Sequence, residues 1–140
     1  MRIAVGTDEV TTVTAAVERH LTATGHVVVD VANGKVWPEV GQDVGTAVAE
    51  GAADRGVVWC WTGTGVSMAA NKVAGVRAAL CTDTETAVGA RRWNDANVLA
   101  LGIRLTGQAD ADPAEAIEIV DAFLATQSEQ SEAENISRLS

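Results

Sequence analysis

The sequence is poor in the residues that build disulfide frameworks, metal sites and basic surfaces. Its two cysteines and two histidines show no metal-ligand spacing, so we expect neither a disulfide framework nor a bound metal. Ten basic residues against nineteen acidic ones give a formal net charge of −9, which argues against nucleic acid or an anionic membrane as a partner. No apolar run approaches the ~18 residues of a membrane span. The opening MRIAVGTDEV has no hydrophobic leader, which favours a cytoplasmic location.

The composition is that of a globular domain. Hydrophobic residues make up 47% of the chain, and 140 residues are enough for one domain with its own core. We find no internal repeat and no linker, so residues 1–127 are expected to form a single α/β domain. Residues 128–140 are polar and rich in Glu and Ser, and we expect a tail that is frayed or only partly helical.

Short apolar runs alternate with helical patterns along the chain. This alternation predicts a three-layer α/β/α sandwich around a five-stranded parallel sheet, which is a Rossmann-like arrangement. Gly25 is expected to end the first helix and Asp83 to cap the fourth. The expected strands span residues 2–6, 26–31, 57–59, 75–81 and 97–101. The expected helices span residues 10–24, 38–53, 66–72, 84–93 and 113–124.

The stretch VVWCWTGTGVSMAANK, residues 57–72, indicates chemistry. A buried strand, a turn rich in Thr and Gly, and a helix start follow one another, and the backbone N–H groups of such a helix start bind anions. Cys60 lies at the mouth of this turn, where amide donors favour the thiolate and allow it to act as a base or nucleophile. The turn lacks the Gly-Lys-Ser/Thr of a P-loop and the third glycine of a dinucleotide fingerprint.

Two ordered motifs, CWTGTGVSMAANKVAGVRAALC and RRWNDANVLALGIRLTG, resemble those of the type B ribose-5-phosphate isomerase and galactose-6-phosphate isomerase family. The resemblance runs from residue 1 to about residue 124. It implies a five-stranded parallel sheet and dimers, often paired into tetramers, with active sites built between subunits. It also implies interconversion of aldose and ketose phosphates through an enediolate, with no metal or other cofactor.

The same resemblance assigns roles to individual residues. Cys60 falls on the family's cysteine base, and Thr62 falls on the turn that holds the negative oxygen. Some relatives place a glutamate base at the position of Val66. Valine cannot act as a base, so Cys60 is left as the base in this chain. Glu9 is a candidate second acid or base, or simply an exposed glutamate of the first helical turn. The candidate substrate-binding residues are Asp8, Gly63, Gly65, Ser67, Trp61, Trp93, Asn94 and Arg104.

The chain departs from the family pattern where sugar and phosphate are handled. Glu9 and Trp93 replace the family's two histidines, and Trp61 replaces the first glycine of the central motif. The basic C-terminal phosphate segment has lost its arginines around residues 131–136, which disfavours a phosphate dianion. All four tryptophans fall near the expected site. Trp59 is expected in the core at the end of its strand, and the other three form either a stacking platform for a sugar face or an aromatic group, or part of a subunit interface.

Three functions follow from these observations. The first is an aldose–ketose isomerase or epimerase acting on a sugar or sugar derivative through Cys60, with a substrate altered from ribose 5-phosphate. The second is the ordinary ribose-5-phosphate isomerase. The third is a protein without its own catalysis, either a ligand-binding domain or one subunit of a hetero-oligomeric isomerase. We expect a homodimer or homotetramer with a small-molecule partner.

Overall fold

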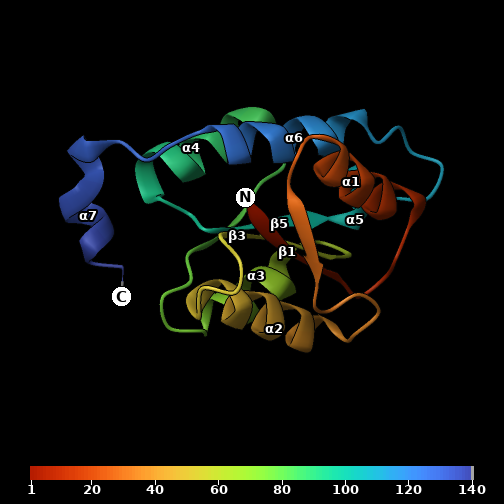
Figure 1. The fold of residues 1–140 in the computed structure, drawn as a ribbon, viewed down its shortest axis with the longest axis horizontal. Helices are drawn as coiled ribbons and strands as arrows, with labels where there is room; N and C mark the ends of the chain where they lie inside the picture. Colours follow the sequence, from red (N-terminus) through yellow and green to blue (C-terminus); the bar gives the residue numbers. More distant parts are fainter. Residues whose placement is uncertain (140) are drawn as a thin grey trace.

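The computed structural model describes residues 1–139, which form a parallel sheet between two helical layers (Figure 1). The strand order is β2-β1-β3-β5-β4, and all neighbouring pairs are parallel. The predicted α/β sandwich with a five-stranded parallel sheet is therefore confirmed. The strands are β1 (Arg2–Thr7), β2 (Val27–Asp30), β3 (Arg55–Cys60), β4 (Ala78–Leu80) and β5 (Val98–Gly102).

Each face of the sheet has its own hydrophobic core. Figure 1 shows α1 (Thr12–Ala23), α4 (Thr84–Asn94) and α6 (Ala114–Ala125) over one face. The other face is covered by α2 (Trp37–Ala49) and α3 (Thr64–Asn71). Three short helices complete the described chain: α5 (Ile103–Thr106), η1 (Gln130–Glu132) and α7 (Ala133–Ser137). Within residues 1–139, every helix is too short or too polar to cross a bilayer.

Local capping explains several helix ends, and it corrects others. The Asp83 side chain accepts a hydrogen bond from the Thr86 amide at the start of α4, as predicted. Thr11 caps α1 through a capping box with Thr14. Helix α3 begins at Thr64, two residues before the predicted start at residue 66, because the turn is tighter than the sequence suggested. Helix α2 ends at Ala49 instead of residue 53, since the chain turns at a glycine with positive φ, Gly51.

The two helices α2 and α3 approach each other across a glycine. A Cβ added to Gly41 would lie 2.6 Å from the Ala69 Cβ and 2.7 Å from the Val66 carbonyl oxygen. Real Cβ atoms essentially never come so close, so the helices can keep this spacing only with glycine at that position. The contact sets the position of α3, the helix that follows the Thr- and Gly-rich turn.

We predict that Gly41→Ala is less stable than Gly45→Ala by about 1–3 kcal/mol, the usual cost of overpacking. Both substitutions gain the same helix propensity, so the difference between them isolates the contact. A Cβ on Gly45 would meet its nearest neighbour, Val73 Cγ2, at 3.2 Å, which needs only a small shift. Urea unfolding of both variants measures the difference. Equal stabilities would mean that α2 and α3 separate without cost.

Candidate active site

A cavity of about 360 Å³ lies at the carboxyl edge of the sheet, beside the end of β3 and the first turn of α3. Ligands of open parallel α/β sheets bind at this edge. The residues that line it come from the ends of β1 and β3, from the start of α2 and from the turn that leads into α3. They are Asp8, Trp37, Cys60, Trp61, Thr62, Thr64, Gly65 and Met68.

The turn between β3 and α3 is held against the end of β5. Gly63 has a φ of 79°, a left-handed conformation that glycine adopts without the cost of a Cβ clash. A Cβ there would lie 2.9 Å from the Leu101 carbonyl carbon. The Arg104 amide donates to the Trp61 carbonyl at 3.0 Å and closes the contact from the other side. The first turn of α3 is therefore fixed relative to the sheet.

This turn presents hydrogen-bond donors that the protein does not use. Among the described residues, the amides of Gly65 and Val66 have no acceptor, because they belong to the first turn of a helix. The hydroxyl groups of Thr62 and Thr64 bond each other at 2.7 Å. Free amides and the positive end of a helix dipole together stabilise an oxyanion.

Cys60 is the thiol at this cavity. It is 5% exposed and packs with the aliphatic core under α2 and α3, yet it is among the residues that line the cavity. Cys81 lies in the other core layer and is 1% exposed. Burial raises the pKa of Cys81 to about 11, and the charge of Asp83 acts in the same direction. Cys81 is thus a small buried hydrophobic residue, as Cys residues away from reactive sites usually are.

Two tryptophans form an aromatic side of the cavity. Trp37 and Trp61 are 44% and 54% exposed. The Trp37 ring lies against Gly65, where an added Cβ would meet its Cε3 atom at 2.9 Å. Trp59 is buried in the opposite core layer, as expected for the end of a strand. Within one chain Trp93 does not reach this cavity, because it lines a separate hollow beside α4.

The structure brings together only some of the candidate residues in a single chain. Gly63 and Ser67 belong to the same turn and helix start but do not line the cavity, and the Ser67 hydroxyl donates to the Thr64 carbonyl at 2.9 Å. Glu9 is exposed, and Arg104 is linked to the cavity only through its backbone bond to Trp61. Asn94 lies at the end of α4, beside the hollow that Trp93 lines. In residues 1–139, no group of three or more His, Cys, Asp or Glu side chains is placed to hold a metal ion.

Larger hollows elsewhere lack this chemistry. The largest, about 680 Å³, borders the loop between α3 and β4 and is lined mainly by small and aliphatic residues, together with Lys72 and Arg77. It contains neither a thiol nor an unpaired helix start. The cavity beside Cys60 is therefore the better candidate for a reaction, although it is smaller.

Sequence reasoning missed two residues of this cavity: Met68 as a site residue, and Thr64 as a partner of Thr62. Met68 could have been found, since it lies three positions after Gly65 and so on the same side of α3. Trp37 was expected near the site with the other tryptophans, and it lines the cavity because α2 packs closely against α3.

The domain carries a turn with unpaired amides and a thiol at the carboxyl edge of its parallel sheet. These features are typical of the class of α/β proteins that stabilise anionic groups at a strand end. This chain belongs to the ribose/galactose isomerase family, whose model matches residues 3–139. The family membership that the two sequence motifs predicted is confirmed by this match.

Individual relatives agree with this assignment. Galactose-6-phosphate isomerase subunit LacB of Clostridium acetobutylicum is 40% identical over 114 residues, which are 76% of this chain and 65% of that protein. Ribose-5-phosphate isomerase B of Escherichia coli is 44% identical over 93 residues, 66% of this chain and 59% of that protein. These matches thus span less than two thirds of either curated relative. The solved ribose-5-phosphate isomerase B of Clostridium thermocellum superposes with a TM-score of 0.87 at 35% identity, covering 99% of this chain and 95% of that one.

We predict that Asp8→Asn stabilises the fold slightly at pH 7. Burial raises the pKa of Asp8, and the charge of Glu9 raises it further, so the folded state disfavours the carboxylate. The free-energy cost of this carboxylate to folding is present above the folded-state pKa. It disappears as the pH falls towards 3.8, the ordinary pKa of an aspartate. Because the group is partly exposed, we expect no more than about 0.5 kcal/mol at pH 7.

Chemical denaturation at pH 7 and at pH 3.5 tests this sign. The gain from Asp8→Asn should be present at the first pH and absent at the second. Glu85→Gln, at an exposed position on α4, is the control. A variant that is less stable than the wild type at pH 7 would contradict the prediction.

Proposed function

We propose that this protein is an aldose–ketose isomerase or epimerase that acts on a sugar or sugar derivative. Its relatives carry the names of sugar-phosphate isomerases, including a D-erythrulose-4-phosphate isomerase of Pectobacterium atrosepticum that is 38% identical over 107 residues. The observation that carries the proposal is the cavity that Cys60 and Gly65 both line, where the Gly65 amide has no acceptor among the described residues.

In the proposed reaction, the Cys60 thiolate removes the proton from the carbon beside the substrate carbonyl. The electron pair of that C–H bond forms the C=C bond of an enediolate, and the carbonyl π pair moves to the oxygen, which accepts a hydrogen bond from the Gly65 amide. In an isomerase the thiol returns the proton to the former carbonyl carbon, while the hydroxyl proton of the neighbouring carbon passes to the enediolate oxygen and leaves the new carbonyl. In an epimerase the proton returns to the opposite face of the same carbon. The amides need no reorientation as the charge forms, because the turn is already packed against β5.

The surroundings favour a substrate that is already in its open-chain form. Neither histidine lines the cavity, since His20 bonds Asp121 at 2.8 Å and His26 lies beside the Met1 amine. This single-chain site therefore has no imidazole, the side chain that most readily exchanges protons near pH 7, so ring opening would be uncatalysed. A four-carbon sugar phosphorylated on its terminal oxygen cannot close a five-membered ring and needs no such group.

The site also supports a two-subunit arrangement. Trp93 is 52% exposed and lines a hollow of about 500 Å³ with Asn94, away from Cys60 in the same chain. In a homodimer or homotetramer, a second copy can present these residues to the cavity. The alternative, a subunit completed by a different chain, rests on the same exposed hollow. It predicts turnover only in the presence of that partner.

We predict that Cys60→Ala lowers carbon–hydrogen exchange at least 10²-fold, the lower end of what a positioned base supplies. The purified protein is mixed in deuterated water with ribose 5-phosphate, a tetrose 4-phosphate and free aldoses, and deuterium incorporation is followed by NMR. The control is Cys81→Ala, which changes a buried thiol in the other core layer and should keep the exchange rate.

Three results are decisive. Exchange on the tetrose phosphate that exceeds exchange on ribose 5-phosphate supports the open-chain substrate. Exchange that survives Cys60→Ala rejects Cys60 as the base. No exchange on any sugar by the homogeneous protein rejects the isomerase proposal for the isolated chain and favours the partner-dependent subunit.

We predict that Trp61→Ala raises the KM about 3–10-fold without changing the oligomeric state, as loss of an aromatic stacking contact would. Trp93→Ala is the comparison, because its ring is about equally exposed but lines a different hollow of the same chain. An unchanged KM is expected if each chain's cavity works alone, and a raised KM if a second copy presents Trp93 to it. Steady-state kinetics and light scattering are measured on both. A change in particle mass with Trp61→Ala would instead assign this ring to a subunit interface.

A further inference from the structure

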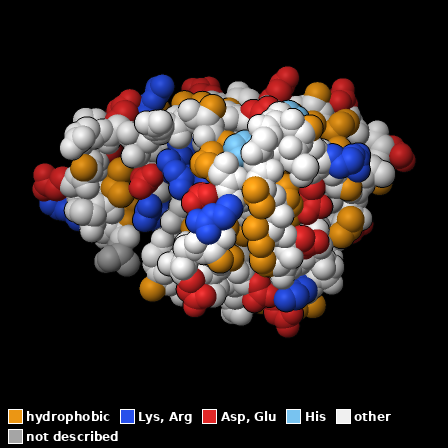
Figure 2. Space-filling view, in the orientation of Figure 1, with side chains coloured by type: hydrophobic (Ala, Val, Ile, Leu, Met, Phe, Trp, Pro, Cys, Tyr) orange, Lys and Arg blue, Asp and Glu red, His pale blue; other side chains and the backbone are white. Residues whose placement is uncertain are grey.

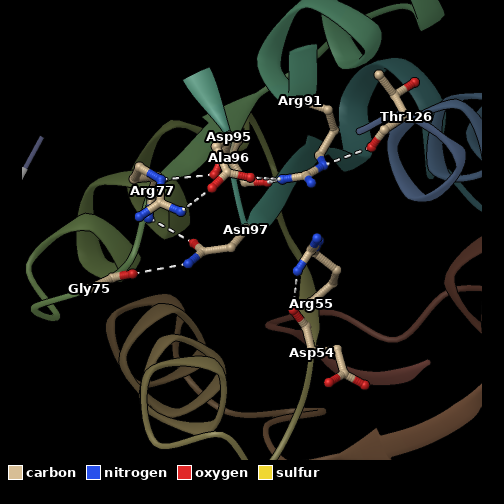
Figure 3. Close-up of polar contacts among 9 residues, drawn as sticks. All are labelled: Asp54, Arg55, Gly75, Arg77, Arg91, Asp95, Ala96, Asn97 and Thr126. Atoms are coloured by element: carbon tan, nitrogen blue, oxygen red, sulfur yellow. Dashed lines mark hydrogen bonds and ion pairs between the residues drawn. The ribbon is translucent and has the colours of Figure 1, made fainter. Parts of the chain in front are cut away.

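The amino-terminal edge of the sheet carries a second cluster of charged side chains (Figure 3). Arg55 begins β3 and Cys60 ends it, so this cluster and the candidate active site lie at opposite ends of one strand. Arg77 precedes β4, and Arg91 extends from α4. Figure 3 shows the Asp95 carboxylate between the guanidinium groups of Arg77 and Arg91, with Arg55 below them and bonded to the Asp54 carbonyl.

The carboxylate of Asp95 is already shared between two of the arginines. Its Oδ1 accepts from Nη1 of Arg91 at 2.8 Å, and its Oδ2 accepts from Nη2 of Arg77 at 2.9 Å. Arg91 also donates from Nε to the Thr126 carbonyl at 3.1 Å and from Nη1 to the Ala96 carbonyl at 2.5 Å. These contacts use the Nε and Nη1 atoms of Arg91 and leave its Nη2 atom without an acceptor among the described residues.

Nη2 of Arg91 is a free donor on a buried side chain. The residue is 3% exposed, and Nη2 has no acceptor among the residues that the structure describes. Every side-chain nitrogen or oxygen of residues 1–139 that is fully buried has a hydrogen-bond partner. Nη2 has no partner, so it must be accessible to solvent. The opening is a cavity of about 410 Å³ that Arg91 lines together with Arg55 and the loop of residues 126–128.

Arg55 brings a further positive charge to the same cavity, which Asp95 also lines. Within residues 1–139 Arg55 forms no ion pair, and its side chain donates to the Asp54 carbonyl at 2.7 Å. Burial lowers the pKa of the Arg55 guanidinium and the like charge of Arg91 lowers it further, against the opposing charges of Asp95 and Asp54. Figure 2 shows several basic side chains near the centre of this face, with acidic ones both beside them and around the rim. The chain as a whole has a formal net charge of −9, so a local excess of positive charge is unusual in it.

We propose that this cavity binds a small oxyanion of the phosphate class, held between the guanidinium groups of Arg55 and Arg91. Guanidinium forks match the oxygen spacing of phosphate and form charge-assisted hydrogen bonds with it. The bound anion offsets the repulsion between the two arginines. The hydroxyl of Ser128 and the amide of Gln127 line the same cavity and are available as further donors. The site is separate from Cys60 and does not depend on the proposed isomerase activity.

A titration with inorganic phosphate at constant ionic strength, balanced with sodium chloride, tests the site by amide NMR. We expect saturable shifts at Arg55 and at residues 126–128. Arg55→Gln should raise the dissociation constant at least about tenfold, because it removes a charged hydrogen-bond donor. It should leave the protein folded, since it also removes a half-buried charge. Arg19→Gln, an exposed position on α1 with the same change of charge, should bind as the wild type does.

A parallel titration with glycerol 3-phosphate distinguishes free phosphate from a phosphate ester, since tighter binding of the ester at residues 126–128 identifies an ester as the occupant. Shifts confined to Gly65 and Val66 that survive Arg55→Gln would place the anion at the candidate active site and overturn the proposal. Equal weakening by Arg55→Gln and Arg19→Gln would show general charge attraction and overturn it as well. Absence of any saturable shift at Arg55 and residues 126–128 has the same consequence.

Discussion

The close contact between the turn after β3 and the end of β5 determines the whole carboxyl edge. A Cβ on Gly102 would lie 2.9 Å from the Thr62 carbonyl oxygen, and a Cβ on Gly63 would lie 2.9 Å from the Leu101 carbonyl carbon. Backbone therefore packs on backbone, and neither glycine can be replaced without moving the turn. Because the turn is fixed, the first amides of α3 hold one direction, and Cys60 ends β3 where that turn begins.

The cavity beside Cys60 is a product of helix packing rather than of the turn alone. Gly41 lets α2 approach α3, and the start of α2 then carries the Trp37 ring to the face of Gly65. The aromatic side of the cavity and its amide side thus come from different helices. A larger residue at either glycine would separate the two sides, so the same small residues support both the fold and the shape of the site.

The two edges of the sheet differ in what they offer a ligand. At the carboxyl edge, neutral amides and a helix dipole act on a site whose nearest charged group is Asp8. At the amino edge, full guanidinium charges act across a cavity with one shared carboxylate. The first arrangement suits a charge that forms during a reaction, and the second suits a permanent anion. Strand β3 connects them, with Arg55 and Cys60 as its ends.

The sequence by itself determined the alternation of strands and helices, the cap at Asp83 and the motif around Cys60, since these depend on residues near one another in the chain. The family resemblance followed from the same local motifs. Only the tertiary structure decided that Trp37 and Met68 share a cavity with Cys60, that Trp93 lies elsewhere, and that Arg55 faces Arg91. Those placements depend on which helix covers which face of the sheet and how closely it packs. Such contacts join residues far apart in sequence, which local patterns do not specify.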